Sequence, residues 1–186
     1  MFDELANSLI QESFRPIRAK ERLAQMRSTP YGAFNAALLT KKKDPEVESR
    51  LLQIAKNTPT STLLASELVK YAKIVMKERW PEAEPYILRS SYASMWYAAE
   101  VIKDRWPEAE VKIKDNARLS SQYARNVIKG RFEAGEPAIL ENPYEIVEYA
   151  IHVVGDRWPE AEPILKADNK APWLEYKYYF GMEEEE

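Results

Sequence analysis

A period of 26 residues in the second two-thirds of the chain limits most strongly how it can fold. Four columns of residues share this step: Tyr71, Tyr97, Tyr123 and Tyr149, each followed by Ala; Arg79, Arg105, Arg131 and Arg157, each followed by a large aromatic; Glu84, Glu110, Glu136 and Glu162; and Ile87, Ile113, Ile139 and Leu165. Several columns in phase over four copies predict tandem repeats, in which each copy buries its apolar face against its neighbours.

Each copy is predicted to form two helices. In the longer one, Tyr97, Ala98, Val101 and Ile102 are spaced to share one helical face. Its start is marked by a column of good N-cap residues: Ser90, Asn116, Asn142 and Asp168. The shorter helix is expected to begin with Pro81, Pro107 and Pro159 at its first position, and a second proline four residues later is expected to keep it short. The pattern predicts an all-α fold, a short α-solenoid of helix-pair repeats over residues 61–182.

The motif that starts the shorter helix carries a resemblance. The string Arg-Trp-Pro-Glu-Ala-Glu-Pro at residues 79–85, followed by Tyr-Ala-x-x-Val-Ile at residues 97–102, resembles the short tandem repeats of many bacteriophage-encoded proteins of unassigned function. The resemblance covers roughly residues 66–170 and implies a phage origin but no chemistry. The third copy departs from it, because Phe132 is followed by Glu133 instead of proline, and a looser turn is expected there.

The two ends of the chain do not follow the period. Residues 1–60 are interpreted as an N-terminal helical segment or cap docked on the first repeat, with helices expected near residues 2–10, 17–26 and 30–39 and another beginning at Asp44-Pro45. The half-repeat from Asp168 to Met182 is rich in aromatics and is expected to cap the last repeat. Residues 183–186 are four glutamates and are interpreted as a solvated acidic tail.

Composition excludes several classes of function. The chain has no cysteine, so disulfides, thiolate metal sites and cysteine nucleophiles are excluded. No apolar run is long enough to span a membrane, and the acidic N-terminus does not resemble a secretory signal, so a cytoplasmic protein without a membrane partner is expected. The net charge of −3 is unlike that of a general nucleic-acid binder, although residues 1–60 have a surplus of positive charge.

No catalytic motif is present in the sequence. The single histidine, His152, has no second histidine or cysteine with which to share a metal, and neither a phosphate-binding glycine loop nor a His-Glu-x-x-His motif occurs. Carboxylate chemistry of a small hydrolase stays an alternative, but nothing distinguishes any two of the 30 acidic residues. We therefore expect a protein that is not an enzyme and needs no cofactor or metal.

Trp96 is the leading candidate for a binding anchor. Its equivalents in the other copies are Lys70, Gln122 and Glu148, so this column is predicted to face water, where a large aromatic is typical of an interface. The alternative is a Trp covered by neighbouring side chains. The predicted partner-binding strip consists of Trp96, Glu100, Gln122, Asn126, Glu148 and His152.

A second candidate site uses the arginines. Arg79, Arg105, Arg131 and Arg157, with Arg18 and Arg22 of a basic N-terminal group, are candidates for anion or nucleic-acid contact. The structural alternative is that each repeated Arg pairs with the Glu of its own copy, because a residue present in every copy serves the architecture.

The combined prediction is a non-enzymatic helical-repeat scaffold that binds protein. The phage resemblance implies an accessory protein that acts on a host protein, for takeover or counter-defence, in the host cytoplasm. Nucleic-acid or nucleotide binding and a structural component of the virion are the alternatives, and a homo-oligomer is left open.

Overall fold

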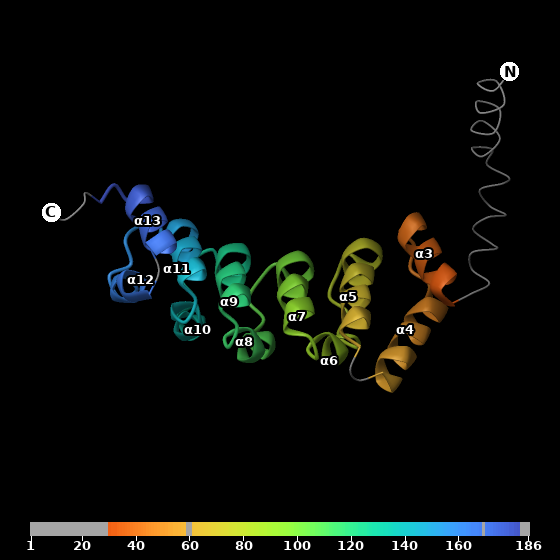
Figure 1. Cartoon of the computed structure of the whole chain (residues 1–186). Helices are drawn as coiled ribbons and strands as arrows, with labels where there is room; N and C mark the ends of the chain where they lie inside the picture. Colours follow the sequence, from red (N-terminus) through yellow and green to blue (C-terminus); the bar gives the residue numbers. More distant parts are fainter. Residues whose placement is uncertain (1–29, 59–60, 169, 183–186) are drawn as a thin grey trace, which may run out of the picture.

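The fold is a single row of helix pairs, seen in a computed structural model that describes residues 30–58, 61–168 and 170–182 (Figure 1). Every regular element among these residues is helical, so the prediction of an all-α fold is confirmed. The helices expected near residues 2–10 and 17–26, the residues Arg18 and Arg22, and the acidic run 183–186 lie outside the described residues. No helix in the described ranges is long and apolar enough to cross a membrane.

Two layers of helices make up the row. The long helices are α5 (Thr62–Tyr71), α7 (Ser91–Tyr97), α9 (Ala117–Tyr123) and α11 (Pro143–Tyr149), with α13 (Lys170–Tyr179) last in the row. The short helices are α6 (Glu84–Ile87), α8 (Pro107–Ile113), α10 (Glu136–Leu140) and α12 (Glu162–Asp168). The pair α3 (Pro30–Thr40) and α4 (Pro45–Asn57) precedes them. Figure 1 shows the long helices side by side, with the short helices below them.

The N-caps form as the sequence predicts. The side chains of Ser90, Asn116 and Asn142 each accept a hydrogen bond from a backbone N–H in the first turn of α7, α9 and α11. These bonds satisfy donors that have no partner inside the helix. The side chain of Asp168, the fourth member of this column, lies outside the described part of the structure.

The prolines set where each short helix begins, but not as predicted. Only Pro107 occupies the first helical position. Pro81 and Pro159 lie in turns, and α6 and α12 begin three residues later, at Glu84 and Glu162. The reason is the second proline of these copies: Pro85 has no N–H to donate to the carbonyl of residue 81, so this stretch is held by turn bonds to Trp80 and the regular helix starts only at Glu84. The second copy has Val111 at this position, and its helix α8 is correspondingly longer.

The third copy does not have the looser turn that we expected. A 3₁₀-helix, η4 (Glu133–Gly135), replaces the proline turn and leads directly into α10. It packs close to α9, because a Cβ atom at Gly135 would lie 2.5 Å from Ser120 Oγ. Glycine at a position where the other copies have alanine therefore allows this closer approach.

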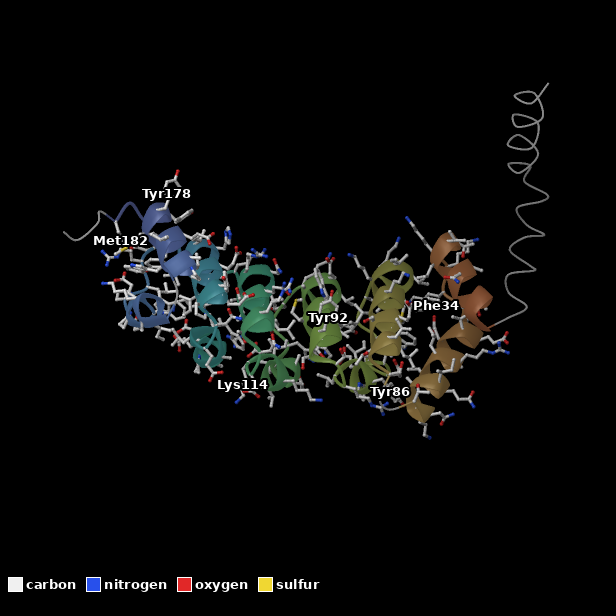
Figure 2. All side chains as sticks on the ribbon, in the orientation of Figure 1. Phe34, Tyr86, Tyr92, Lys114, Tyr178 and Met182 are labelled. Carbon is white, nitrogen blue, oxygen red and sulfur yellow. The ribbon has the colours of Figure 1, made fainter. Side chains whose placement is uncertain are left out.

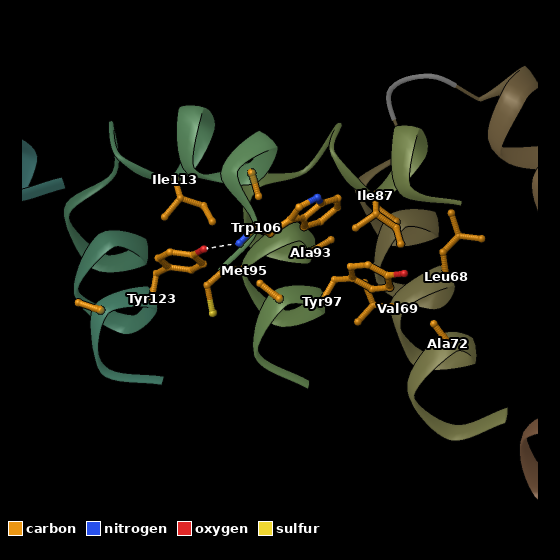
Figure 3. Packing of buried hydrophobic residues seen from close by; sticks show 14 of the residues in the cluster. Leu68, Val69, Ala72, Ile87, Ala93, Met95, Tyr97, Trp106, Ile113 and Tyr123 are labelled. Atoms are coloured by element: carbon orange, nitrogen blue, oxygen red, sulfur yellow. Dashed lines mark hydrogen bonds between the residues drawn. The ribbon is translucent and has the colours of Figure 1, made fainter. Parts of the chain in front are cut away.

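The core is a continuous series of buried aromatic pairs. Trp80, Trp106, Phe132 and Trp158 are all buried. Each packs on the tyrosine of the preceding long helix, for example Tyr97 on Trp106 with ring centroids 5.1 Å apart (Figure 3). Tilted ring pairs at this distance add to the stabilisation from area burial alone.

Each long helix ends in an unusual way that the sequence did not predict. The Tyr-Ala-x-x-Val-Ile segment is α-helical only to its tyrosine and then continues as a π-helix: η1 (Ala72–Met76), η2 (Ala98–Ile102), η3 (Ala124–Ile128) and η5 (Ala150–Val154). The next residue has a left-handed backbone, with φ of 58°, 58°, 57° and 71° at Lys77, Lys103, Lys129 and Gly155. Its N–H donates to the carbonyl of the alanine five residues earlier. This sharp ending reverses the chain within three residues and delivers the aromatic to the core.

Three of these left-handed positions carry lysine, although only glycine adopts that conformation without steric cost. We expect Lys103→Gly to raise the free energy of unfolding by about 0.5–1 kcal/mol, the left-handed cost less the greater chain entropy of glycine. Urea unfolding of the whole chain measures this. Lys70→Gly, inside α5, is the matched control and should lower stability by about 1 kcal/mol. Equal losses at both positions would contradict the assigned backbone.

Candidate binding surface

The structure separates the two predicted sets of site residues. The repeated arginines lie at the turns between long and short helices, whereas the strip of Trp96, Glu100, Gln122, Asn126, Glu148 and His152 lies on α7, α9, α11 and the π-helices that follow them. Figure 2 shows the side chains along the row, with Tyr92 on α7 and with Tyr86 and Lys114 in the region of the short helices. The two sets of residues therefore lie in different surroundings.

Every repeated arginine is held by the glutamate of its own copy. Arg105 donates two hydrogen bonds to Glu110, each of 2.8 Å, and the pairs that begin with Arg79, Arg131 and Arg157 have the same geometry at 2.7–2.9 Å. Two parallel N–H···O bonds are the strongest arrangement for this ion pair. The structural interpretation of the arginine column, pairing within each turn, is confirmed.

A buried tyrosine hydroxyl connects this ion pair to the next long helix. The hydroxyl of Tyr123 accepts from the backbone N–H of Trp106 at 2.8 Å and donates to Glu110 at 2.9 Å. The hydroxyls of Tyr97, Tyr149 and Tyr176 make the equivalent two bonds in the other copies. We call this arrangement of Arg, Glu, backbone N–H and Tyr the tyrosine clamp. Tyr176 shows that the last long helix has one extra residue, because the period would place its tyrosine at position 175.

The tyrosine bonds of the clamp occur once more, in residues that the period did not include, where Lys43 stands in place of the arginine and pairs with Glu78 instead. The N–H of Asp44 donates to the hydroxyl of Tyr71 at 3.1 Å, and that hydroxyl donates to Glu48 at 3.2 Å. Lys41 has the left-handed backbone of the equivalent repeat position, with φ of 53°. Residues 41–48 therefore reproduce the turn of a repeat within the segment that we had interpreted as a cap. Sequence analysis missed this because α4 is longer than the other short helices, which places Asp44 and Tyr71 27 residues apart instead of 17.

The clamp shifts the ionisation of its members. The ion pair with Arg105, followed by the hydrogen bond from Tyr123, holds the pKa of Glu110 below its ordinary value despite partial burial, and Glu136 and Glu162 are lowered in the same way by their arginines. Burial raises the pKa of Tyr71 and Tyr97 to about 12. Burial likewise raises the pKa of Tyr123, Tyr149 and Tyr176. The folded state therefore keeps the glutamates charged and the tyrosines neutral.

These contacts bear on the anion-binding alternative. The guanidinium edge that would meet a phosphate already faces a carboxylate in all four copies. Arg131 also lies over the ring of Trp158, with its Cζ 5.7 Å from the centroid. Displacing each glutamate would break both the ion pair and a bond to the buried tyrosine. The arginine column therefore offers no ready anion site, and Arg18 and Arg22 fall outside what the structure describes.

Removing one clamp hydroxyl tests its contribution to stability. Tyr123→Phe should lower the free energy of unfolding by about 1–3 kcal/mol, because the buried N–H of Trp106 loses its acceptor while the ring packing is kept. The control is Tyr144→Phe, since the Tyr144 side chain is 62% exposed. Chemical denaturation of both variants measures the difference. Equal stabilities would show that water replaces the hydroxyl and that the clamp is not structural.

The raised tyrosine pKa values predict the response to alkali. A tyrosine whose pKa is higher in the folded state contributes stability that is fully present below the ordinary value of 10.0 and is lost as the pH rises through the folded value, about 12 for Tyr97. We therefore expect the free energy of unfolding to fall steadily above pH 10. Unfolding curves at several alkaline pH values test this, and Tyr97→Phe should make the decline shallower. A stability that stays constant up to pH 12 would contradict buried neutral hydroxyls.

Trp96 lies at a groove between α5 and α7. The groove has a volume of about 330 Å³ and is lined mainly by apolar side chains: Val69, Ile74, Tyr92, Ala93 and Trp96, with Ser66 and three charged residues completing it. Trp96 is half-buried and packs against the core, so it is less exposed than its column suggests. Its Nε1 atom is buried and has no hydrogen-bond partner among the described residues. Tyr92 is 56% exposed and meets the indole edge-on at 6.2 Å, so the two rings together form one wall.

Charged side chains stand at the rim of this groove. Lys73 makes a 2.8 Å ion pair with Glu100, the one carboxylate that lines the groove. Lys70 has only a distant contact, 4.0 Å from Glu67. The lining therefore carries two positive charges and one negative charge, on a chain whose net charge is −3.

The rest of the predicted strip is a polar surface. Glu148 lies 3.7 Å from Arg125 and 3.5 Å from His152, and all three side chains are exposed. Asn126 is exposed and Gln122 half-buried. The structure thus brings Trp96 and Glu100 together at the groove, while Glu148 and His152 form a separate polar cluster on α11 and η5. In the described ranges, no group of three or more His, Asp or Glu side chains is arranged to hold a metal ion.

Sequence reasoning missed the residues that accompany Trp96. Tyr92 belongs to a column with Ser66, Arg118 and Tyr144. Because these side chains carry polar groups, the column predicts that Tyr92 is exposed. This column therefore carried a usable signal. Comparison within a column could not identify Lys70 and Lys73, because they belong to the preceding copy. They lie near Trp96 only through the packing of the preceding long helix against α7.

Comparisons of this chain with known protein families, with curated proteins and with solved structures found no match.

Proposed function

We propose that the chain is a non-enzymatic helical-repeat scaffold that binds another protein through the exposed face of its long helices. One observation carries this proposal: an apolar groove, walled by Tyr92 and Trp96, occurs on a face that is otherwise polar. Large aromatics at the centre of a polar surface are typical of interface anchors. Repeats support such a face well, because the clamps maintain the architecture while exposed positions vary from copy to copy.

The partner that we propose is a host protein. The motif at residues 79–85 resembles those of phage proteins, and a phage accessory protein of this kind would act on host machinery, for takeover or for counter-defence. A role inside the virion is the other candidate from the same resemblance, and mass spectrometry of purified particles separates the two.

Affinity capture tests the proposed function. The tagged chain, incubated with nuclease-treated host lysate, should retain one stoichiometric protein, and Tyr92→Ala should reduce its recovery at least about tenfold, as expected for loss of an exposed anchor. Val111→Ala is the control, because Val111 is 63% exposed but lies on α8, in the other layer. Equal recovery by wild type and Tyr92→Ala would contradict the groove as the site. Retention of nucleic acid alone would contradict protein binding.

A further inference from the structure

We infer that the groove between α5 and α7 takes an acidic segment of a partner protein, one that places a single large apolar side chain between carboxylates. This inference rests on the proposed function and adds the chemistry of the partner. Three features of the groove carry it: its apolar lining, the sign of the charge at its rim, and the ammonium donors that the ion pairs at the rim leave unused.

The lining selects an apolar side chain. Val69, Ile74 and Ala93 lie opposite or beside the Tyr92–Trp96 wall, and the exposed polar area comes from the rim. A volume of about 330 Å³ is at the lower end of the range for small-ligand sites. It suits one side chain such as Leu, Met or Phe in a continuing polypeptide. Burying such a side chain is worth about 1.5–3 kcal/mol, which is too little for specific binding alone, so further contacts are needed.

The rim provides those contacts as positive charge. Lys73 already donates to Glu100, which leaves the other two donors of its ammonium group unused in that ion pair. Lys70 is only 4.0 Å from Glu67, too far for a hydrogen bond. The side chains of both lysines are about half exposed, at 50% and 48%. A carboxylate beside the groove would therefore reach ammonium donors that these two ion pairs leave unused.

Positively charged side chains also lie on the same face of the next long helices. Arg118, in the column of Tyr92, is exposed on α9, and Arg125 on η3 is 3.7 Å from its nearest carboxylate, Glu148. The short-helix layer is different, since its repeated glutamates are the members of the clamps and are paired with arginine. The groove lining itself, with two lysines and one glutamate, thus carries a net charge of +1 on a chain whose net charge is −3, which favours acidic segments over basic ones.

Fluorescence anisotropy with a panel of synthetic labelled peptides tests the inference on the full chain. Each peptide carries one Leu, Met or Phe, flanked on both sides by Glu, by Gln or by Lys. Glu-flanked peptides should bind at least about tenfold more tightly than Gln-flanked ones at low salt, and Lys-flanked ones should not bind. The preference should shrink as salt is raised, because exposed charges are screened. Absence of binding by every Glu-flanked peptide, or equal binding by the Lys-flanked ones, would overturn the inference.

Charge reversal at the rim locates the site. Lys70→Glu should weaken binding of the Glu-flanked peptides at least about tenfold and allow Lys-flanked ones to bind. Lys114→Glu is the control, because it changes the net charge equally at an exposed residue of the other layer, and it should alter affinity less than about twofold (Figure 2). Circular dichroism confirms that both variants are folded. Equal effects of the two variants would show a net-charge effect and overturn the site.

One further probe separates a foreign partner from a second copy of this chain. The peptide of residues 176–186 joins an aromatic run and Met182 to four glutamates, and so has the required chemistry. If it is the only peptide that binds, and the protein self-associates with concentration in sedimentation, the occupant is a second copy and the inference of a partner protein is overturned. Failure of all peptides with continued host-protein capture would overturn this inference but not the proposed function.

Discussion

The tyrosine clamp is the interaction on which the rest of the structure depends. A tyrosine of each long helix reaches back to the turn of the preceding copy, accepts the N–H of the residue that starts the short segment, and donates to a glutamate held by arginine. That N–H is buried and has no partner in a helix or sheet, so leaving it without an acceptor would cost a few kilocalories per mole. The ring of the same tyrosine packs on the core aromatic of the following turn, as Tyr123 does on Phe132. One side chain therefore satisfies the backbone, stabilises the ion pair and joins two copies.

The clamp also explains why the long helices end as they do. The π-helical turn ends in a left-handed residue, and Trp80 and its equivalents follow three residues after it, where the tyrosine of the next copy can reach the backbone. The left-handed lysines pay a steric cost that the packed aromatics offset. At the N-terminal end, Asp44, Glu48 and Tyr71 show that the tyrosine bonds persist without the aromatic, without the arginine pair and without the 26-residue spacing. The hydrogen bonds of the tyrosine are thus kept where the 26-residue sequence motif is not.

Because the clamps hold the copies together from one side, the opposite positions of the long helices are free to differ. The column of Lys70, Trp96, Gln122 and Glu148 has no shared chemistry, and that of Ser66, Tyr92, Arg118 and Tyr144 repeats only its tyrosine. Where two aromatics of α7 meet Lys70 of α5 and Lys73 of η1, an apolar groove with a positive rim results. On α11 the equivalent columns give a polar cluster around Glu148. The proposed binding site is therefore formed by residues that differ between neighbouring copies of an otherwise regular structure, which is how repeat proteins acquire specificity.

The sequence by itself determined the period, the helical class, the N-caps and the arginine–glutamate pairing, because each depends on residues within a few turns of one another. It also singled out Trp96 by comparison with its column. It did not determine the groove, since Lys70 and Lys73 come from another copy and meet Trp96 only when α5 packs on α7. It did not show the clamp at residues 41–48, where the spacing changes and only the hydrogen bonds are kept. A periodic sequence pattern identifies the residues that the structure of every copy requires. What one pair of copies does differently depends on distances across the stack, and only the tertiary structure decided those.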